Sequence, residues 1–141
     1  MTANEPRKLR LMSDGPSEEA LEGLKKMKEE IAVFQREMPV IRKEGEAALR
    51  RLLPIAQGGG GQCRYVAAFL LGLYHGGRFP FDLTDLRGLD RHIFNDCIAV
   101  LRMDRAPLRE VHKYFEGGNE IWEDLAIRWG RKDHLADTRS M

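Results

Sequence analysis

The most regular pattern of hydrophobic and polar positions lies between residues 17 and 38. Apolar residues recur there at spacings of 4, 3, 4, 3 and 4, and charged residues fill most other positions. This heptad spacing is typical of a coiled-coil seam, so we expect an amphipathic helix over residues 17–43. Ser17 can cap its first turn, and Pro39 is expected to end or kink it. The seam residues are Ala20, Leu24, Met27, Ile31, Phe34 and Met38.

This stripe has two interpretations. It can pack on the chain's own core, or it can bind a partner protein or a second copy of the chain, giving a homodimer through residues 20–38. The segment is highly charged, lies towards one end of the chain and is set off by Pro39. These features keep the partner-binding interpretation open beside the core interpretation.

Helical periodicity returns several times between residues 44 and 130, in segments separated by glycines. No strand-like alternation appears, so we expect an all-α fold, a compact bundle of about five to six helices with the amphipathic, coiled-coil-like helix at its N-terminal side. The helices are expected over 44–57, 62–75 and 90–103, and after Asp82, Pro107 and Asn119. Their expected core residues include Leu49, Leu52, Val66, Phe69, Leu70, Ile93, Phe94, Cys97, Leu101, Leu108, Val111, Trp122 and Leu125.

The two ends of the chain, residues 1–16 and 131–141, are polar and are expected to be flexible tails around the helical domain at 44–130. With 43% hydrophobic residues in 141, the chain can bury one core. No apolar run approaches the ~20 residues that span a bilayer, and no signal-peptide core stands at the N-terminus. Two cysteines, Cys63 and Cys97, form neither a disulfide framework nor a zinc motif. We therefore expect a cytoplasmic protein.

Charge gives little support to nucleic-acid binding. The chain has 23 basic and 22 acidic residues, whereas DNA-binding domains usually have a basic excess. The alternative function, nucleic-acid binding, would use one arginine-rich region, as in a helix-turn-helix regulator. Acidic residues alternate with these arginines, so mutual salt bridges on a solvated face are a simpler interpretation. The arginines are Arg87, Arg91, Arg102, Arg105 and Arg109.

No catalytic or metal-binding motif is recognisable. The four histidines lack the spacing of a zinc helix, and the four glycines at 58–61 are not followed by the lysine of a phosphate-binding loop. His92 and Cys97 are five residues apart, which places them on different faces of a helix. Asp82 and Asp90 precede helices and are expected to be caps. We predict a non-enzymatic protein without cofactor or metal.

A loop of aromatic residues is a second candidate for partner binding. Phe79 and Phe81 flank Pro80 after a double glycine, and Arg78 precedes them. They could present an apolar anchor to a partner. Loop aromatics also commonly fix a connection to the core, and that interpretation is favoured here.

Part of the chain resembles a family of uncharacterised domains encoded on proteobacterial plasmids and integrative elements. The resemblance covers about residues 45–130, and the segment from Phe79 to Asp90 is its most distinctive part. The amphipathic helix lies outside it. The matching segments read ALRRLLPIAQ from Ala48, VAAFLLGLY from Val66, FPFDLTDLRGLD from Phe79, VHKYF from Val111 and IWEDLA from Ile121.

The resemblance implies a setting and carries no catalytic residues. Small non-enzymatic proteins of mobile elements often bind host machinery or regulate the element's own genes. The expected function is therefore a protein-binding accessory protein of a mobile genetic element, such as an anti-CRISPR-like inhibitor of a host defence complex. The alternative is a DNA-binding transcriptional regulator of the element. The partner-binding residues are expected to be Leu24, Met27, Ile31, Phe34, Arg78, Phe79 and Phe81.

Overall fold

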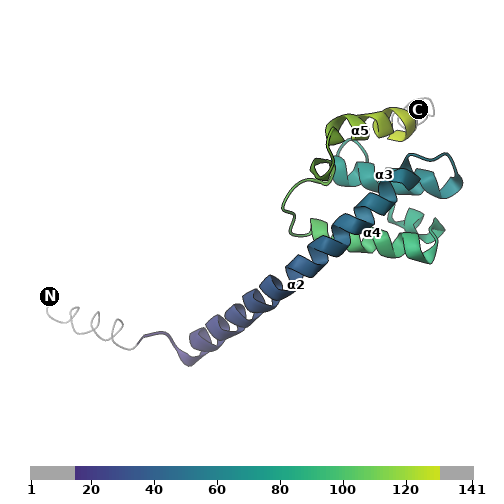
Figure 1. Cartoon of the computed structure of the whole chain (residues 1–141). Helices are drawn as coiled ribbons and strands as arrows, with labels where there is room; N and C mark the ends of the chain where they lie inside the picture. Colours follow the sequence, from purple (N-terminus) through teal and green to yellow (C-terminus); the bar gives the residue numbers. More distant parts are fainter. Residues whose placement is uncertain (1–14, 131–141) are drawn as a thin grey trace. The chain divides into compact units, whose positions relative to one another are not determined.

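A computed structural model describes residues 15–130, and the predicted tails lie outside it apart from Gly15 and Pro16. Every regular element in the described part of the chain is helical, which confirms the all-α prediction (Figure 1). The chain divides into one unit that ends at Met38 and a second that begins at Pro39. The elements are α2 (Glu18–Ala56), α3 (Gly61–Tyr74), η1 (Leu83–Gly88), α4 (Arg91–Asp104), η2 (Val111–Tyr114), α5 (Gly118–Leu125) and η3 (Ala126–Gly130).

Helix α2 starts where the sequence predicts. The backbone N–H of Ala20 donates a hydrogen bond of 3.1 Å to Ser17 Oγ, which caps the first turn. Glu18 and Glu19 occupy that turn, where negative charge favours the positive end of the helix dipole.

The helix does not end at Pro39, which was one of the two predictions for this residue, because α2 continues through both Pro39 and Pro54 to Ala56. An internal proline removes one backbone hydrogen bond and costs about 3 kcal/mol. Around Pro54 this cost is offset by burial, since Leu52, Leu53 and Ala56 are all in the core. Pro39 follows a long run of good helix formers, whose propensity favours continuing the helix.

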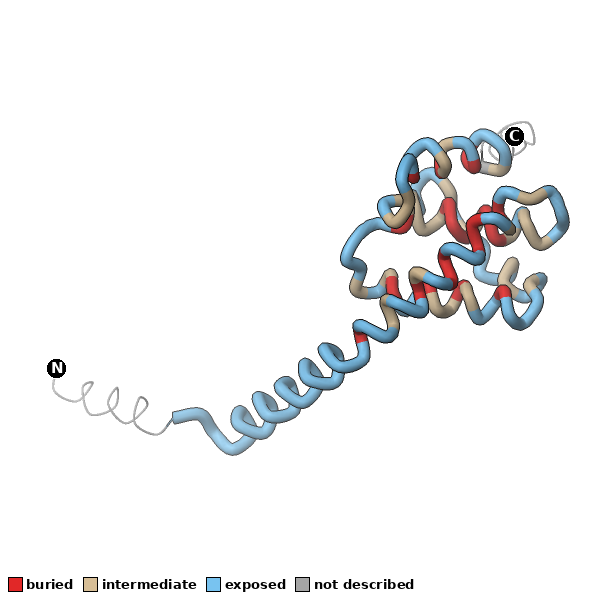
Figure 2. The backbone as a smooth tube through the Cα atoms, viewed as in Figure 1, coloured by how far each residue is buried: buried red, intermediate tan, exposed pale blue. Residues whose placement is uncertain are grey.

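The second unit has a single hydrophobic core, to which the last turns of α2 and all of the later helices contribute (Figure 2). Trp122 is its largest fully buried side chain, and the indole Nε1–H donates a 3.1 Å hydrogen bond to the carbonyl of Leu70. At Gly45, an added Cβ would lie 2.9 Å from Met103 Sδ and 3.0 Å from the Ala99 carbonyl, so α2 and α4 approach closely there. Other core residues are Leu49, Leu52, Val66, Phe69, Ile93, Cys97, Val100, Val111 and Leu125.

Three residues predicted to be buried are exposed. Phe94 and Leu101 are 37% and 38% exposed, because α4 buries the neighbouring face that carries Ile93 and Cys97. Leu108 is 64% exposed, since the helix predicted from Pro107 does not form and only the four-residue η2 follows.

Two of the predicted helix starts differ in detail. Helix α5 begins at Gly118 rather than after Asn119, and Gly117 precedes it with a left-handed φ of 68° that favours glycine. Asp90 precedes α4 as expected, but its side chain accepts a 3.0 Å hydrogen bond from Gln62 Nε2 instead of capping the helix. Gln62 Oε1 in turn accepts from the Asp90 N–H at 2.7 Å, which ties α3 to the start of α4.

Candidate functional site

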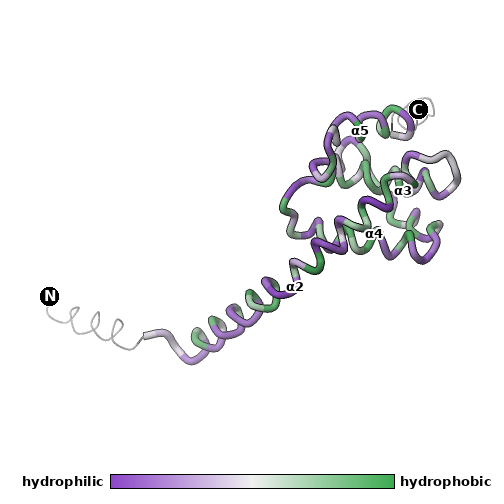
Figure 3. The backbone as a smooth tube through the Cα atoms, viewed as in Figure 1, coloured by the Kyte–Doolittle hydropathy of each residue, from purple (hydrophilic) through white to green (hydrophobic). Residues whose placement is uncertain are grey.

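The most prominent surface feature is the apolar stripe on the first half of α2. Five large apolar side chains of this stripe are about half exposed. All residues from 17 to 37 are exposed, and apolar positions alternate with polar ones along this segment (Figures 2 and 3). We call this set the α2 stripe; its members are Leu21 at 53%, Leu24 at 48%, Met27 at 56%, Ile31 at 49% and Phe34 at 47% exposure.

The α2 stripe keeps the heptad spacing that the sequence predicts, with two changes at its edges. Met38, the last seam residue predicted, is buried at 6% exposure and is not available to a partner. Leu21, which the spacing did not include, adds apolar surface beside Leu24. Covering a half-exposed Leu, Ile or Phe stabilises a complex by about 1 kcal/mol, so the stripe as a whole could contribute several kcal/mol. Contiguous exposed apolar surface of this kind marks interaction sites in soluble proteins.

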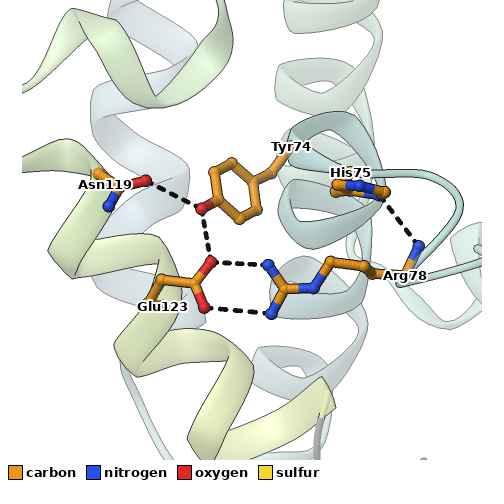
Figure 4. A network of polar contacts seen from close by, with 5 residues as sticks. All are labelled: Tyr74, His75, Arg78, Asn119 and Glu123. Carbon is orange, nitrogen blue, oxygen red and sulfur yellow. Dashed lines mark hydrogen bonds and ion pairs between the residues drawn. The ribbon is translucent and has the colours of Figure 1, made fainter.

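The loop residue Arg78 lies in a polar network between α3 and α5 (Figure 4). Its guanidinium donates two hydrogen bonds to Glu123, at 2.8 Å to Oε2 and 3.1 Å to Oε1. The hydroxyl of Tyr74 donates to the same Oε2 at 2.5 Å and lies 3.0 Å from Asn119 Oδ1. Arg78 and Tyr74 together lower the pKa of Glu123 to about 2. The network fixes the loop to α5.

The two loop aromatics pack inward. Phe79 and Phe81 are partly buried against the core, and the Phe81 ring meets that of Phe69 edge-on, with centroids 5.7 Å apart. The Arg78 guanidinium lies over the Phe79 ring at 4.7 Å. These contacts support the interpretation that the loop aromatics fix a connection to the core, and they leave the α2 stripe as the stronger docking surface.

The arginine-rich region is exposed, but its predicted salt bridges do not form. The ion pairs among residues 15–130 join Arg50 to Glu46, Arg51 to Asp96 and Arg78 to Glu123. Asp96 therefore pairs with α2 through bonds of 2.8 and 3.1 Å, and not with a neighbouring arginine. The predicted recognition helix of a helix-turn-helix is also missing, since η2 has only four residues. The five arginines Arg87, Arg91, Arg102, Arg105 and Arg109 are all exposed.

A shallow groove between α2 and α4 is a feature that the sequence did not indicate. It has a volume of about 220 Å³, and Ile41 and Ile98 contribute its apolar lining. Phe94 and Leu101 lie on the same side of α4 as Ile98, because they are four and three residues away from it. The helical spacing alone gave no signal for this surface, since both residues adjoin the buried face.

Two features of the described residues bear on catalysis and metal binding, namely the buried thiol of Cys97 and the placement of possible metal ligands. Burial raises the pKa of the Cys97 thiol to about 12, so it is protonated at neutral pH and a poor nucleophile. Among residues 15–130, no group of three His, Cys, Asp or Glu side chains is placed to hold a metal ion. Within the same residues, no helix is long and apolar enough to cross a membrane.

Comparison with known proteins gives one finding. The model of a family of unknown function, DUF7673, matches residues 46–130, which is more than half of the chain. No curated protein and no solved structure matches. The match starts within α2 and ends in η3, so the α2 stripe lies outside it.

Proposed function

Because the chain belongs to the family of unknown function DUF7673, whose description names no activity, we propose from the geometry that it is a non-enzymatic protein-binding protein. The α2 stripe is its docking surface. The observation that carries this proposal is the half-exposure of five large apolar side chains on a single helix face. A partner protein that covers this face would remove the apolar surface from water, which is the main driving force of protein association.

The proposal extends to a biological setting through the sequence resemblance. We place the protein among the accessory proteins of mobile genetic elements, with a host defence complex as the target class. Inhibitors of this kind act by occupying a surface on a larger assembly and need no catalytic residue. A helix with one apolar face suits that mode, since amphipathic helices bind in hydrophobic grooves.

The test is an affinity capture of the tagged full-length chain from host cells, with and without nuclease, read by mass spectrometry. Leu24→Glu with Ile31→Glu places two charges on the α2 stripe. Arg36→Glu is the matched control, because it changes the net charge by the same amount at an exposed position off the stripe. We expect one stoichiometric protein with the wild type and with the control, in nuclease-treated samples, and its loss with the double variant.

Two results would contradict the proposal. Equal capture by the double variant would exclude the α2 stripe as the docking surface. A captured protein that has no role in host defence would leave protein binding intact but would contradict the proposed target class.

The second candidate function is DNA binding by a regulator of the element. The observation that favours it is the exposure of all five arginines and the absence of any of them from the ion pairs of residues 15–130. Each phosphate contact would make the affinity fall with salt, so replacing Arg91 and Arg102 with glutamine should weaken binding and reduce the salt dependence. Fluorescence anisotropy with a labelled duplex from 50 to 200 mM salt measures both effects, and five phosphate contacts predict a loss of affinity of about 500-fold over that range. Binding that does not change with salt would remove this candidate.

A further inference from the structure

We propose that the occupant of the α2 stripe is a second copy of this chain, bound as a parallel two-helix coiled coil. The inference rests on the proposed docking surface: the second copy covers the α2 stripe in the free chain, and a host partner would have to displace it. In heptad terms, Leu24 and Ile31 occupy a positions, and Ala20, Met27 and Phe34 occupy d positions. Two-stranded coiled coils favour a β-branched residue at a with Leu at d, and of these positions Ile31 alone follows that preference.

The charges beside the stripe distinguish the two orientations that a second copy could take. The g positions, just before each a residue, include Gly23 and Glu30. The e positions, just after each d residue, include Lys28 and Gln35. Glu30 and Lys28 are therefore on opposite sides of the stripe, and the e position before Lys28 holds the apolar Leu21. Residues at e and g positions set partner choice and orientation in coiled coils.

A parallel pair avoids repulsion and an antiparallel pair does not. In a parallel dimer each g residue faces the e residue five positions later on the other helix, so Glu30 faces Gln35 and Gly23 faces Lys28 of the second copy. In an antiparallel dimer centred on the stripe, g faces g and e faces e. Glu30 would then lie near Glu30 of the second copy, and Lys28 near Lys28 of the second copy. Like charges would therefore lie together at the centre of the contact.

The size of the α2 stripe indicates a reversible dimer. Five side chains that are about half exposed would bury roughly 900 Å² in total over the two copies. Stable interfaces bury about 1,200–2,000 Å², so this contact belongs to the weak class. We expect a monomer–dimer equilibrium with a dissociation constant of roughly tens to hundreds of micromolar.

The orientation can be tested at Gln35 in the full-length chain. Gln35→Lys would create two attractive pairs with Glu30 in a parallel dimer, and Gln35→Glu would create two repulsive pairs. Both substitutions are at an exposed position whose neighbours three and four residues away, Ala32, Ile31, Met38 and Pro39, are uncharged. We expect sedimentation equilibrium to show a dissociation constant three- to fivefold lower for Gln35→Lys and three- to fivefold higher for Gln35→Glu.

The outcomes separate this inference from the proposed function. A wild-type chain that stays monomeric up to about 1 mM overturns the second copy as occupant, given the interface size above. The affinity capture then tests separately whether the α2 stripe binds another protein. A dimer in which Gln35→Lys is no tighter than Gln35→Glu overturns the parallel orientation. A dimer that persists in the Leu24→Glu, Ile31→Glu variant overturns the stripe as the dimer contact.

Discussion

At the residue scale, the packing of the second unit's core depends on a few positions, among them the Trp122 indole N–H and the missing Cβ of Gly118. Trp122 is fully buried and satisfies its only polar group through the carbonyl of Leu70. Gly118 is placed so that an added Cβ would lie 2.7 Å from the carbonyl carbon of His112, which is closer than any side chain tolerates. The sequence indicated Trp122 as core from its helical spacing. It could not indicate Gly118, because the contact comes from backbone that approaches only in the folded chain.

Replacing Trp122 with phenylalanine should lower the free energy of unfolding by about 1–3 kcal/mol, because the smaller ring leaves a cavity in the core and the hydrogen bond to the Leu70 carbonyl is lost. Ile127→Ala is the control, since Ile127 is 61% exposed and its truncation should cost less than about 0.5 kcal/mol. Urea denaturation followed by circular dichroism measures both. Equal effects of the two changes would contradict the role given to Trp122 in the core.

The network around Glu123 predicts a dependence on pH. The pKa of Glu123 is lowered from 4.5 to about 2 by hydrogen bonds from Arg78 and Tyr74. A lowered carboxyl pKa means that its stabilisation is present above pH 4.5 and is lost as pH falls towards 2. The pair is partly exposed, so solvent screening reduces its contribution.

Glu123→Gln should therefore lower the free energy of unfolding at pH 7, and its difference from the wild type should shrink as pH falls from about 5 to 2. Denaturant titrations across that range measure the difference. Glu120→Gln is the control, because Glu120 is exposed on the same helix and is absent from the described ion pairs. A difference that stays constant with pH would contradict the assignment.

At the element scale, α2 combines two environments in a single helix. Its residues up to 37 are exposed, whereas Ala48, Leu49, Leu52 and Ala56 are in the core. The spacing between residues 17 and 38 was sufficient to predict the first part. A helix over residues 44–57, which contains Pro54, was also predicted. Its continuity with the first part through Pro39 was missed, because an internal proline usually ends or kinks a helix.

Two glycines of α2 provide a matched pair. Gly45→Ala should lower the free energy of unfolding by about 1–3 kcal/mol, because the new methyl would meet Met103 and the Ala99 carbonyl. A Cβ added at Gly23 would have no neighbour within 4 Å. Gly23→Ala should therefore stabilise the helix by about 1 kcal/mol. Thermal unfolding followed by circular dichroism compares them. A destabilising Gly23→Ala would show that the first part of α2 is not helical in solution.

At the scale of the whole molecule, the two units differ in what holds them together. The second unit has its own core, so its stability should not depend on the apolar character of the α2 stripe. Leu24→Glu with Ile31→Glu should change the free energy of unfolding by less than about 0.5 kcal/mol at concentrations where the chain is monomeric. Leu49→Ala, in the core, should cost 2–5 kcal/mol. A large loss with the stripe variant would indicate that the stripe supports folding rather than binding.

The all-α class and the heptad spacing of the α2 stripe were both predictable, since they follow from periodicity along the chain, whereas the exposure of the stripe was not. The ion pair and hydrogen bonds that join the helices of the second unit were not predictable, because they connect residues far apart in sequence. Arg51 pairs with Asp96, and Gln62 exchanges two hydrogen bonds with Asp90. Contacts between distant segments also explain why Phe94 was predicted to be in the core. Phe94 is next to Ile93 in sequence, and only the packing of α4 shows which of the two side chains faces inward.

Both tryptophans of the chain, Trp122 and Trp129, lie in the last turns of the second unit, and each indole donates a hydrogen bond to a backbone carbonyl. Intrinsic fluorescence excited at the indole band therefore reports the folding of that unit alone. The α2 stripe has no tryptophan, so a partner without tryptophan can bind there without changing the emission. A single sample can thus be read through two independent channels, with fluorescence for folding and molecular mass for association.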